Sequence, residues 1–593
     1  MKQFFLTFAA VILGGFVLLM IPFIILSAII TASMSETETT LKSGTVLRLD
    51  LTEELSDRDL NSPAYRVRNA MNGGSVTHGM NTLRDKLADA AEDDNISALY
   101  ITGSSVATDF ANLRDLRRAI AEFKEASGKP VYYFDSSISN GAEYVATVAD
   151  SIFLAPEGSA LLTGCTASKY YVKRLADKYG LGFDVIKHGK YKSAVEPYFR
   201  DNMSDEDREQ TLRYINVLWG EIRDSIAAAR NIEPASIDNY VDELKGLSGH
   251  ATAAVEAGLV DRAIYFDEFI ELLRKVSGKK DSEKFDVLDI YDYCTTASKT
   301  AVLSTSNDKV AIVYAGGQIY DGKSAGDDAN IYGDDLAETL RTVRKDTTIK
   351  AVVMRVNSPG GSALASDIIW REVKLISEEK PFIVSMGGYA ASGGYYISCA
   401  ANYIFAEPTT LTGSIGVFGM IPNASKLADN AGVSFEIVST SKNPIVTGIQ
   451  PVSAPLMAAL TGSVENTYKT FVSRVSDGRD MTFEGVDSIG GGHVWTGLDA
   501  QKIGLVDQLG NLDDAIDMAV EMAGLGDDYE TQDYPKIDDS MAAVMKQFGL
   551  SVRAGIGHSL LGSEFDQVEK IKEKMESPTG YVWAICDEVA SCN

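Results

Sequence analysis

The strongest constraint on the fold is an internal repeat, because the second half of the chain resembles the first at a shift of 252 residues. At this shift residues 152–153 match residues 404–405, and residues 175–177 match residues 427–429. A repeat of roughly 220–240 residues is far longer than a solenoid unit, so the pattern indicates two whole domains in tandem.

Each half shows the same alternation of strands and helices. Buried strands are expected at 45–51, 96–102 and 131–134 in the first half, and at 309–319, 349–357 and 381–386 in the second. Helical patterns lie between them, as at residues 113–126. Strands that alternate with helices favour parallel βαβ units, so we expect an α/β fold in both halves.

The sequence divides into six segments. They are an N-terminal hydrophobic segment (1–33), a linker (34–44), an N-terminal α/β repeat (45–280), a polar linker (281–305), a C-terminal α/β repeat (306–540) and a tail with amphipathic helical patterns (541–593).

The N-terminal segment predicts a transmembrane signal anchor. Residues 4–32 carry no charge, and about 20 apolar residues suffice to cross a bilayer. The run exceeds the h-region of a secretory signal and lacks an A-x-A site; a cleaved signal peptide is the alternative. Lys2 precedes the run, while Glu36 and Glu38 follow it. The positive-inside rule then leaves the N-terminus in the cytoplasm and the remaining chain on the far side.

Composition excludes several classes of protein. The formal charge of −28 and the pI of about 4.6 argue against a nucleic-acid partner. The five cysteines form no CxxC pair, so no zinc site is indicated. Cys586 and Cys592 can bridge in an oxidising compartment, and unpaired thiols are the alternative. No P-loop motif is present, and we expect neither a metal nor another cofactor.

The most informative single stretch is PFIVSMGGYAASGGYYIS, at residues 381–398. It predicts a buried strand, a tight turn of small residues and the start of a helix. Ser392 lies in the turn, where glycines allow a substrate backbone to approach. The next N–H, from Gly393, lies near a helix N-terminus, which favours negative charge. The alternative is an ordinary Gly-rich turn.

The two halves differ where chemistry is expected. Ser392 matches Asn140 in the first half, and the loop RVNSPGGS (355–362) has no Gly-Gly counterpart there. Conversely, Lys192 in FDVIKHGKYKSAVEP (183–197) matches Pro444. These complementary losses predict one site assembled from both halves, with the nucleophile and oxyanion donors from one and a base from the other.

A lysine is the expected base. None of the five histidines lies in a triad signature, although one of them can still be near in space. A lysine must be neutral to accept a proton, so burial has to lower its pKa by about 3 from about 10.4. Lys190 and Lys192 would face the same side of a strand, so the pattern alone leaves both open.

The motifs MGGYAASGGYYIS, RVNSPGGS, LTGSIGVFG (411–419) and GKYKSAVEP together resemble signal peptide peptidase A in its long, duplicated form. The resemblance implies a fold like that of ClpP and the crotonases. It also implies a nucleophile at Ser392, a general base at Lys192 rather than Lys190, and Ser414 as the residue that orients the lysine. Backbone N–H groups of Gly361 and Gly393 are the implied oxyanion donors.

The same resemblance implies a serine endopeptidase that degrades remnant signal peptides after their release from preproteins. The implied setting is a bacterial inner membrane with the catalytic part on the periplasmic side, and the implied assembly is a bowl-shaped homotetramer. Two alternatives remain, a crotonase-like acyl-CoA enzyme and a non-catalytic membrane-tethered scaffold.

Overall fold

The computed structural model describes residues 41–59, 65, 77–280, 283–294, 306–324, 329–445, 448, 450–536 and 583–585. The predicted anchor (4–32), the helical patterns of the tail, and Cys586 and Cys592 lie outside these residues. Within the described chain, no helix combines the length and apolar character needed to span a membrane. Cys294 and Cys399 are free thiols, and Cys399 is buried.

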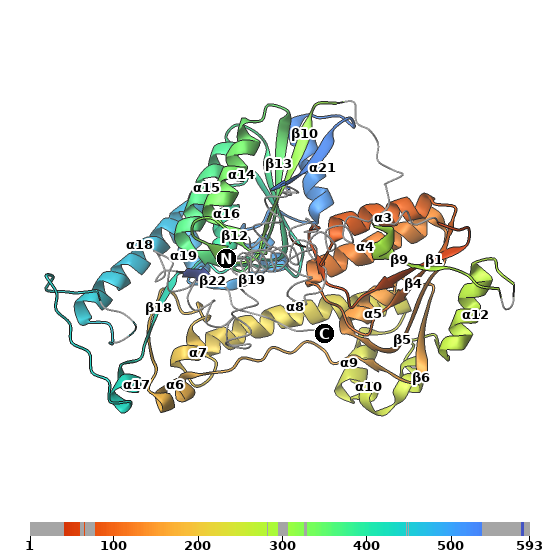
Figure 1. The fold of residues 1–593 in the computed structure, drawn as a ribbon, viewed down its shortest axis with the longest axis horizontal. Helices are drawn as coiled ribbons and strands as arrows, with labels where there is room; N and C mark the ends of the chain where they lie inside the picture. Colours follow the sequence, from red (N-terminus) through yellow and green to blue (C-terminus); the bar gives the residue numbers. More distant parts are fainter. Residues whose placement is uncertain are drawn as a thin grey trace, which may run out of the picture.

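The N-terminal half is built on a six-stranded sheet with the order β8-β6-β5-β4-β1-β9 (Figure 1). Its strands are β1 (Thr45–Asp50), β4 (Ile96–Thr102), β5 (Val131–Ser139), β6 (Ser151–Leu161), β8 (Arg262–Ala263) and β9 (Val287–Asp289). Its helices are α3 (Met80–Glu92), α4 (Phe110–Ser127), α5 (Asn140–Ala146), α6 (Lys173–Tyr179), α7 (Glu196–Phe199), α8 (Asp205–Arg230), α9 (Pro234–Asp242), α10 (Lys245–Ser248), α11 (His250–Glu256), α12 (Phe266–Val276) and α13 (Ile290–Tyr293).

The C-terminal half repeats this plan with an eight-stranded sheet, whose main order is β19-β17-β15-β13-β10-β21. Its strands are β10 (Lys309–Gly316), β13 (Ile349–Ser358), β15 (Phe382–Ala391), β16 (Tyr403–Ala406), β17 (Leu411–Gly413), β19 (Val494–Thr496), β20 (Gln508–Leu509) and β21 (Glu530–Tyr534). Its helices are α14 (Gly333–Lys345), α15 (Ala363–Ser377), α16 (Gly393–Ser398), α17 (Ser425–Asn430), α18 (Ala454–Arg479), α19 (Phe483–Ile489), α20 (Gly497–Lys502) and α21 (Leu512–Ala523).

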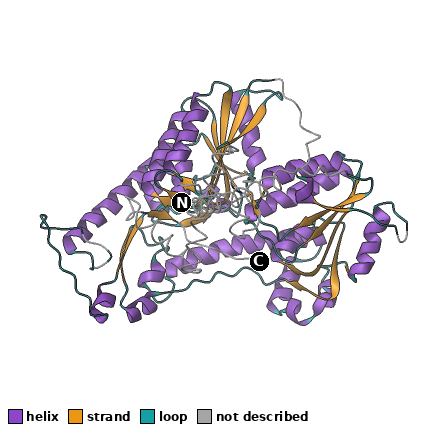
Figure 2. Ribbon diagram, in the orientation of Figure 1, coloured by secondary structure: helices purple, strands orange, loops and turns teal. Residues whose placement is uncertain are grey.

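Both central sheets are covered on two faces, which explains their nearly continuous apolar strands. In β13 the residues Val352 and Met354 pack toward α14 and α15, whereas Ala351 and Val353 pack toward α21. The β1, β4, β10, β13 and β15 pairings are parallel, as the alternating pattern predicted. Figure 2 shows these helix–sheet–helix layers in both halves.

A third sheet joins the two halves. Its order is β12-β11-β14-β22-β18-β7, formed by β12 (Ile331–Tyr332), β11 (Ile319–Tyr320), β14 (Gly360–Ser362), β22 (Trp583–Ile585), β18 (Phe418–Asn423) and β7 (Gly182–Lys187). A separate small pair consists of β2 (Leu55–Ser56) and β3 (His78–Gly79). Strand β7 comes from the N-terminal half and runs antiparallel to β18 of the C-terminal half.

Helix α8 also connects the halves, and in Figure 1 it runs beneath the C-terminal half and ends within the N-terminal half. Its N-cap Ser204 accepts a hydrogen bond from Asp207 N, and three acidic residues in its first turn suit the helix dipole. Tyr214 packs with a cluster from the C-terminal half, whereas Ile222 and Ile226 belong to the N-terminal core. One long helix therefore ties the two cores together.

Candidate active site

Ser392 lies at the junction of β15 and α16, as the strand–turn–helix pattern predicted. Its backbone has φ 56° and ψ −113°, a conformation that non-glycine residues rarely adopt. Ser392 N donates to Gly413 O at 2.8 Å, which fixes the turn against β17. Gly394 has no room for a side chain, because an added Cβ would lie 2.5 Å from Ser358 O. Only glycine at position 394 allows the backbone of Ser358 to lie this close to the turn.

Lys192 reaches Ser392 from the other half of the molecule. Its Nζ lies 2.7 Å from Ser392 Oγ, and both side chains are at most 1% exposed. The same Nζ lies 3.0 Å from Ser414 Oγ and 3.3 Å from Ser414 O. The structure therefore brings together the expected nucleophile, the expected base and the residue expected to orient that base.

Lys190 is excluded from this cluster by its position. The chain leaves β7 at Lys187, so residues 190 and 192 lie in a loop and not on one face of a strand. Lys190 is exposed, with its Nζ 5.0 Å from the centroid of the Tyr191 ring. Lys192 turns inward instead and is buried.

A run of glycines allows the Lys192 loop to lie against the C-terminal half. An added Cβ at Gly492 would be 2.5 Å from Lys192 N, and one at Gly416 would be 3.2 Å from Lys192 Cδ. Tyr191 N also donates to Gly491 O at 3.1 Å. The run Gly490–Gly492 is visible in the sequence as an unusual cluster, but its role was not anticipated.

Gln210 on α8 is another residue that sequence reasoning missed. Its side chain is 1% exposed, and its Nε2 donates to Tyr191 O at 3.2 Å and to Ser193 Oγ at 3.0 Å, on either side of Lys192. Its Oε1 accepts from Val494 N at 3.2 Å. A glutamine on a long helix carries no motif, so only the tertiary structure reveals this link between the lysine loop and β19.

The expected oxyanion donors lie beside Ser392. The Cβ position of Gly393 is 3.0 Å from Gly361 N and 3.1 Å from Gly360 Cα, so the two backbones are in contact. An added Cβ at Gly361 would meet Ile319 O at 2.0 Å, so glycine is required there too. Gly360 N donates to Ser358 Oγ at 3.2 Å, which holds the loop before Gly361.

The histidines of the described chain do not hydrogen-bond Ser392. His188 Nδ1 lies 2.8 Å from Glu465 Oε1, and its ring stacks on Tyr468. His493 stacks on Trp495, and burial lowers its pKa. His493 contributes its carbonyl, which accepts from Ser414 N at 2.7 Å. Within the part of the chain that is described, no group of acidic, histidine or cysteine side chains could hold a metal.

The matching position in the N-terminal half is occupied by a structural side chain. Asn140 is fully buried; its Oδ1 accepts from Thr163 N at 3.0 Å and its Nδ2 donates to Gly164 O at 3.1 Å. This amide ties the turn to the end of β6. The two matching turns therefore differ as the repeat indicated: Asn140 is a buried structural residue, whereas Ser392 contacts Lys192.

Comparisons with known proteins place the chain among peptidases. The family "Peptidase family S49" matches residues 123–280 and 374–526, and the family "Clp protease" matches residues 323–411. Two bacterial proteins named "Protease 4" are similar. The one from Salmonella typhi is 38% identical over 78% of this chain and 75% of its own. The one from Haemophilus influenzae is 35% identical over 88% and 86%. "Serine protease SPPA, chloroplastic" of Arabidopsis thaliana is 29% identical over 90% and 78%.

Fold, site and comparisons define a serine peptidase built from two tandem ClpP-like α/β domains. The chain belongs to peptidase family S49.

Proposed function

We propose that this peptidase is a membrane-anchored endopeptidase in which Ser392 is the nucleophile and Lys192 the general base. The observation that carries this proposal is the buried 2.7 Å contact between Lys192 Nζ and Ser392 Oγ. Burial disfavours an ammonium relative to a neutral amine, and the neutral amine is the form that can accept the Ser392 proton.

The steps of the reaction follow from the arrangement. Lys192 takes the Ser392 proton as Oγ attacks a peptide carbonyl, and the oxyanion is held by the N–H groups of Gly361 and Gly393. One such donor is typically worth about 2.7–4 kcal/mol. Lys192 then protonates the leaving amine, and water activated by the same lysine hydrolyses the acyl-enzyme. Ser414 holds the amine in position between these steps.

We propose that the substrate binds as an extended strand along β14. Support comes from the chain itself, because residues 583–585 form β22 antiparallel to β14, with Gly361 opposite Ala584. The same strand pairs with β18. Main-chain pairing of this kind accepts many sequences, which suits the degradation of remnant signal peptides.

A membrane location would bring the site to such peptides. The uncharged run 4–32, preceded by Lys2 and followed by Glu36 and Glu38, supports a single-pass anchor with a cytoplasmic N-terminus. We place the catalytic part on the periplasmic side of a bacterial inner membrane. Resistance of the full chain to alkaline extraction from membranes, lost when residues 4–32 are deleted, would support this location.

We also propose that copies of the chain associate, as a homotetramer, through the arm formed by β7, β18, α6 and α17. The tip of this arm exposes large apolar side chains, including Leu175 (57%), Tyr179 (54%), Val433 (48%) and Val438 (95%). Exposed apolar clusters mark interaction surfaces. Light scattering of the detergent-solubilised chain should give four copies, and Val438→Asp with Leu175→Asp should lower that number.

The experiment that tests the function uses the full chain in detergent and an apolar peptide with the length and hydrophobicity of a signal sequence. Ser392→Ala and Lys192→Met should abolish cleavage while the melting temperature is retained. Lys190→Met is the matched control, since Lys190 is exposed two residues away, and it should cleave at the wild-type rate. Chelators should have no effect.

The other outcomes point to the alternatives. Unchanged cleavage in Lys192→Met would exclude Lys192 as the general base. Turnover of an acyl-CoA without peptide cleavage would favour a crotonase-like enzyme, and no turnover of either substrate would favour a scaffold.

A further inference from the structure

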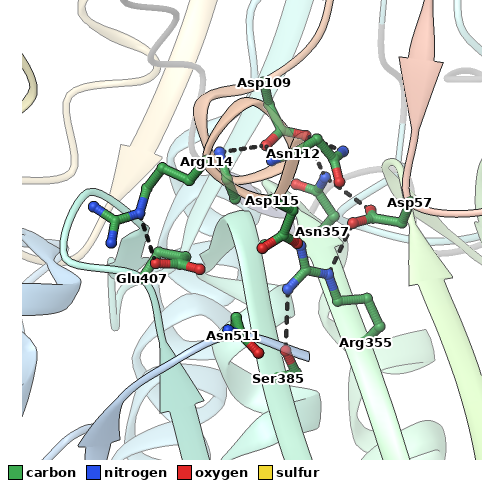
Figure 3. A network of polar contacts seen from close by, with 12 residues as sticks. Asp57, Asp109, Asn112, Arg114, Asp115, Arg355, Asn357, Ser385, Glu407 and Asn511 are labelled. Carbon is green, nitrogen blue, oxygen red and sulfur yellow. Dashed lines mark hydrogen bonds and ion pairs between the residues drawn. The ribbon is translucent and has the colours of Figure 1, made fainter. Parts of the chain in front are cut away.

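A partly buried polar network links the two halves (Figure 3). Asp57, Asp109 and Asp115 come from the N-terminal half, and Arg355 and Asn357 from β13 of the C-terminal half. Arg355 is 2% exposed, and its guanidinium Nε donates to Asp57 Oδ1 at 2.8 Å. Its Nη2 lies 3.8 Å from Asp115 Oδ2. The reaction outlined above uses none of these groups.

Asn357 is the member that reaches the catalytic strand. Its Nδ2 donates to Asp109 Oδ2 at 2.8 Å and to Asp57 Oδ2 at 3.0 Å. Its Oδ1 accepts from the backbone N of Tyr389 at 3.1 Å. One amide therefore connects two carboxylates of one half to the backbone of β15 in the other.

This contact lies at an irregularity between β13 and β15. Val356 pairs with Met386, but Ser358 pairs with Ala390, so residues 387–389 of β15 lie opposite Asn357 alone. The Asn357 side chain supplies the acceptor that the regular ladder would have provided. Bulges of this kind redirect a strand, and this one lies just before the Ser392 turn.

The two glycines of the bulge fit around the network. An added Cβ at Gly387 would be 3.0 Å from Asn357 Cγ, and one at Gly388 would be 3.0 Å from Asp109 Cβ, Cγ and Oδ1. Asp109 is itself fixed as the N-cap of α4, where Oδ1 accepts from Ala111 N and Asn112 N. The Asp109 side chain of the N-terminal half is thus packed directly on β15, the strand that leads to Ser392.

The neighbours of Asn357 along both strands are parts of the site. Tyr389 comes three residues before Ser392, whose unusual backbone must be held by its surroundings. Asn357 itself precedes the loop of Ser358, Gly360 and Gly361. A shift at this amide would move the nucleophile and an oxyanion donor together.

We propose that Asn357 is a positioning residue for the Ser392 turn and that Asp109 holds it in place across the contact between the halves. Docking of the N-terminal half then sets the geometry of the nucleophile as well as supplying the lysine. This inference rests on the proposed role of Ser392.

The test is a double-variant cycle in the full chain, with peptide cleavage as the readout. Asn357→Asp and Asp109→Asn should each lower kcat roughly 10- to 100-fold, as small displacements of reacting groups do, with KM nearly unchanged. The kcat of the double variant should fall no further than that of the worse single variant, because the amide then at position 109 can donate to the carboxylate then at position 357, which restores the contact in the reverse direction. Activities are expressed per folded chain, measured by near-UV circular dichroism.

Two further variants separate positioning from general loss of contact. Gly388→Ala keeps every polar partner but inserts a methyl against Asp109, and it should also lower kcat. Arg213→Gln is the control. It removes another ion pair between the halves, from Arg213 Nε to Asp499 Oδ2 at 2.7 Å, and it should leave kcat within twofold. In the double variant of Arg213→Gln and Asn357→Asp, the fold-losses of kcat from the two single variants should multiply.

The proposal is overturned if folded Asn357→Asp and Asp109→Asn both keep kcat within twofold, or if Arg213→Gln loses as much activity as they do. Independent, multiplying losses in the double variant would overturn it as well. Failure of the proposed function has a different signature, which is cleavage that survives Ser392→Ala.

Discussion

Ser414 contacts Lys192 Nζ through both its hydroxyl and its carbonyl, at 3.0 and 3.3 Å. Its φ of 49° lies in the left-handed region, and its N–H is held by His493 O. The backbone of Ser414 is therefore held independently of its side-chain contacts, which suits a residue that orients the Lys192 amine.

Removing the Ser414 hydroxyl should lower kcat roughly 10- to 100-fold with little change in KM, because the amine then loses one of its fixed partners. Both Ser414→Ala and Ser414→Gly delete the hydroxyl, but only glycine is at ease at a positive φ. Equal losses in the two variants are expected in steady-state peptide cleavage. A fully active Ser414→Gly would show that the hydroxyl is not needed to orient the lysine.

Glu143 is a buried carboxyl that no catalytic step uses. It is 0% exposed, and neither carboxylate oxygen has a hydrogen-bond partner within the described chain. Burial raises the pKa of Glu143 to about 8. The folded state then keeps a proton that the unfolded state releases above its ordinary pKa of about 4.3. Stability should therefore fall as the pH rises from about 4.3 toward 8.

Glu143→Gln should remove this pH dependence, since an amide does not titrate. We expect a higher melting temperature than wild type at pH 8 and a much smaller difference at pH 5, measured by thermal unfolding of the full chain. Glu157→Gln is the matched control because the Glu157 side chain is 91% exposed. A gain at pH 8 no larger than at pH 5 would contradict the assignment of a protonated carboxyl.

At the scale of elements, helix α8 determines where Lys192 lies. Gln210 holds the residues on both sides of Lys192 and also the backbone of β19. Replacement by an isosteric apolar side chain would leave these buried groups unpaired.

Gln210→Met should reduce kcat roughly tenfold or more through a displaced lysine loop, and should slow modification of Ser392 by an active-site-directed phosphonate to the same extent. The exposed α8 residue Leu212 offers the control Leu212→Ala. If kcat and the modification rate stay at wild-type values in folded Gln210→Met, α8 does not position the lysine.

The main elements and the turn of Ser392 could be predicted because their patterns are local. Continuous apolar runs such as 349–357 correspond to buried parallel strands, here β13 (Ile349–Ser358). Small residues around Ser392 likewise predicted the β15–α16 turn. The repeat also indicated that Lys192 and Ser392 come from different halves.

Other parts of the site depend on contacts between distant segments and leave no local pattern. The pattern alone could not distinguish Lys190 from Lys192, because both would face the same side if this stretch were a strand; the loop after Lys187 separates them. Gln210 and Asn357 act through backbone groups of other elements, so their residue types alone say little. Similarly, no property of residues 583–585 predicts a strand beside β14.

At the scale of the whole molecule, each chain contains a complete set of candidate catalytic groups. Lys192 and Ser392 meet within one chain, although they belong to different halves. An oligomer would then carry one independent site per copy.

Co-assembly of Lys192→Met chains with Ser392→Ala chains should therefore restore no activity. The measurement is peptide cleavage by co-expressed, co-purified variants, with each variant alone as the control. Recovery of a substantial fraction of wild-type activity would mean that the lysine of one copy serves the serine of another.

The claim that a lysine of one half activates a serine of the other is tested most directly by the rate at which a phosphonate modifies Ser392. Intact-mass measurement of the full chain at pH 8 gives this rate without dependence on a peptide substrate. The expected result is modification at Ser392 in wild type and Lys190→Met at equal rates, and a rate lower by at least roughly 100-fold in folded Lys192→Met. A rate in Lys192→Met within twofold of wild type would contradict the account.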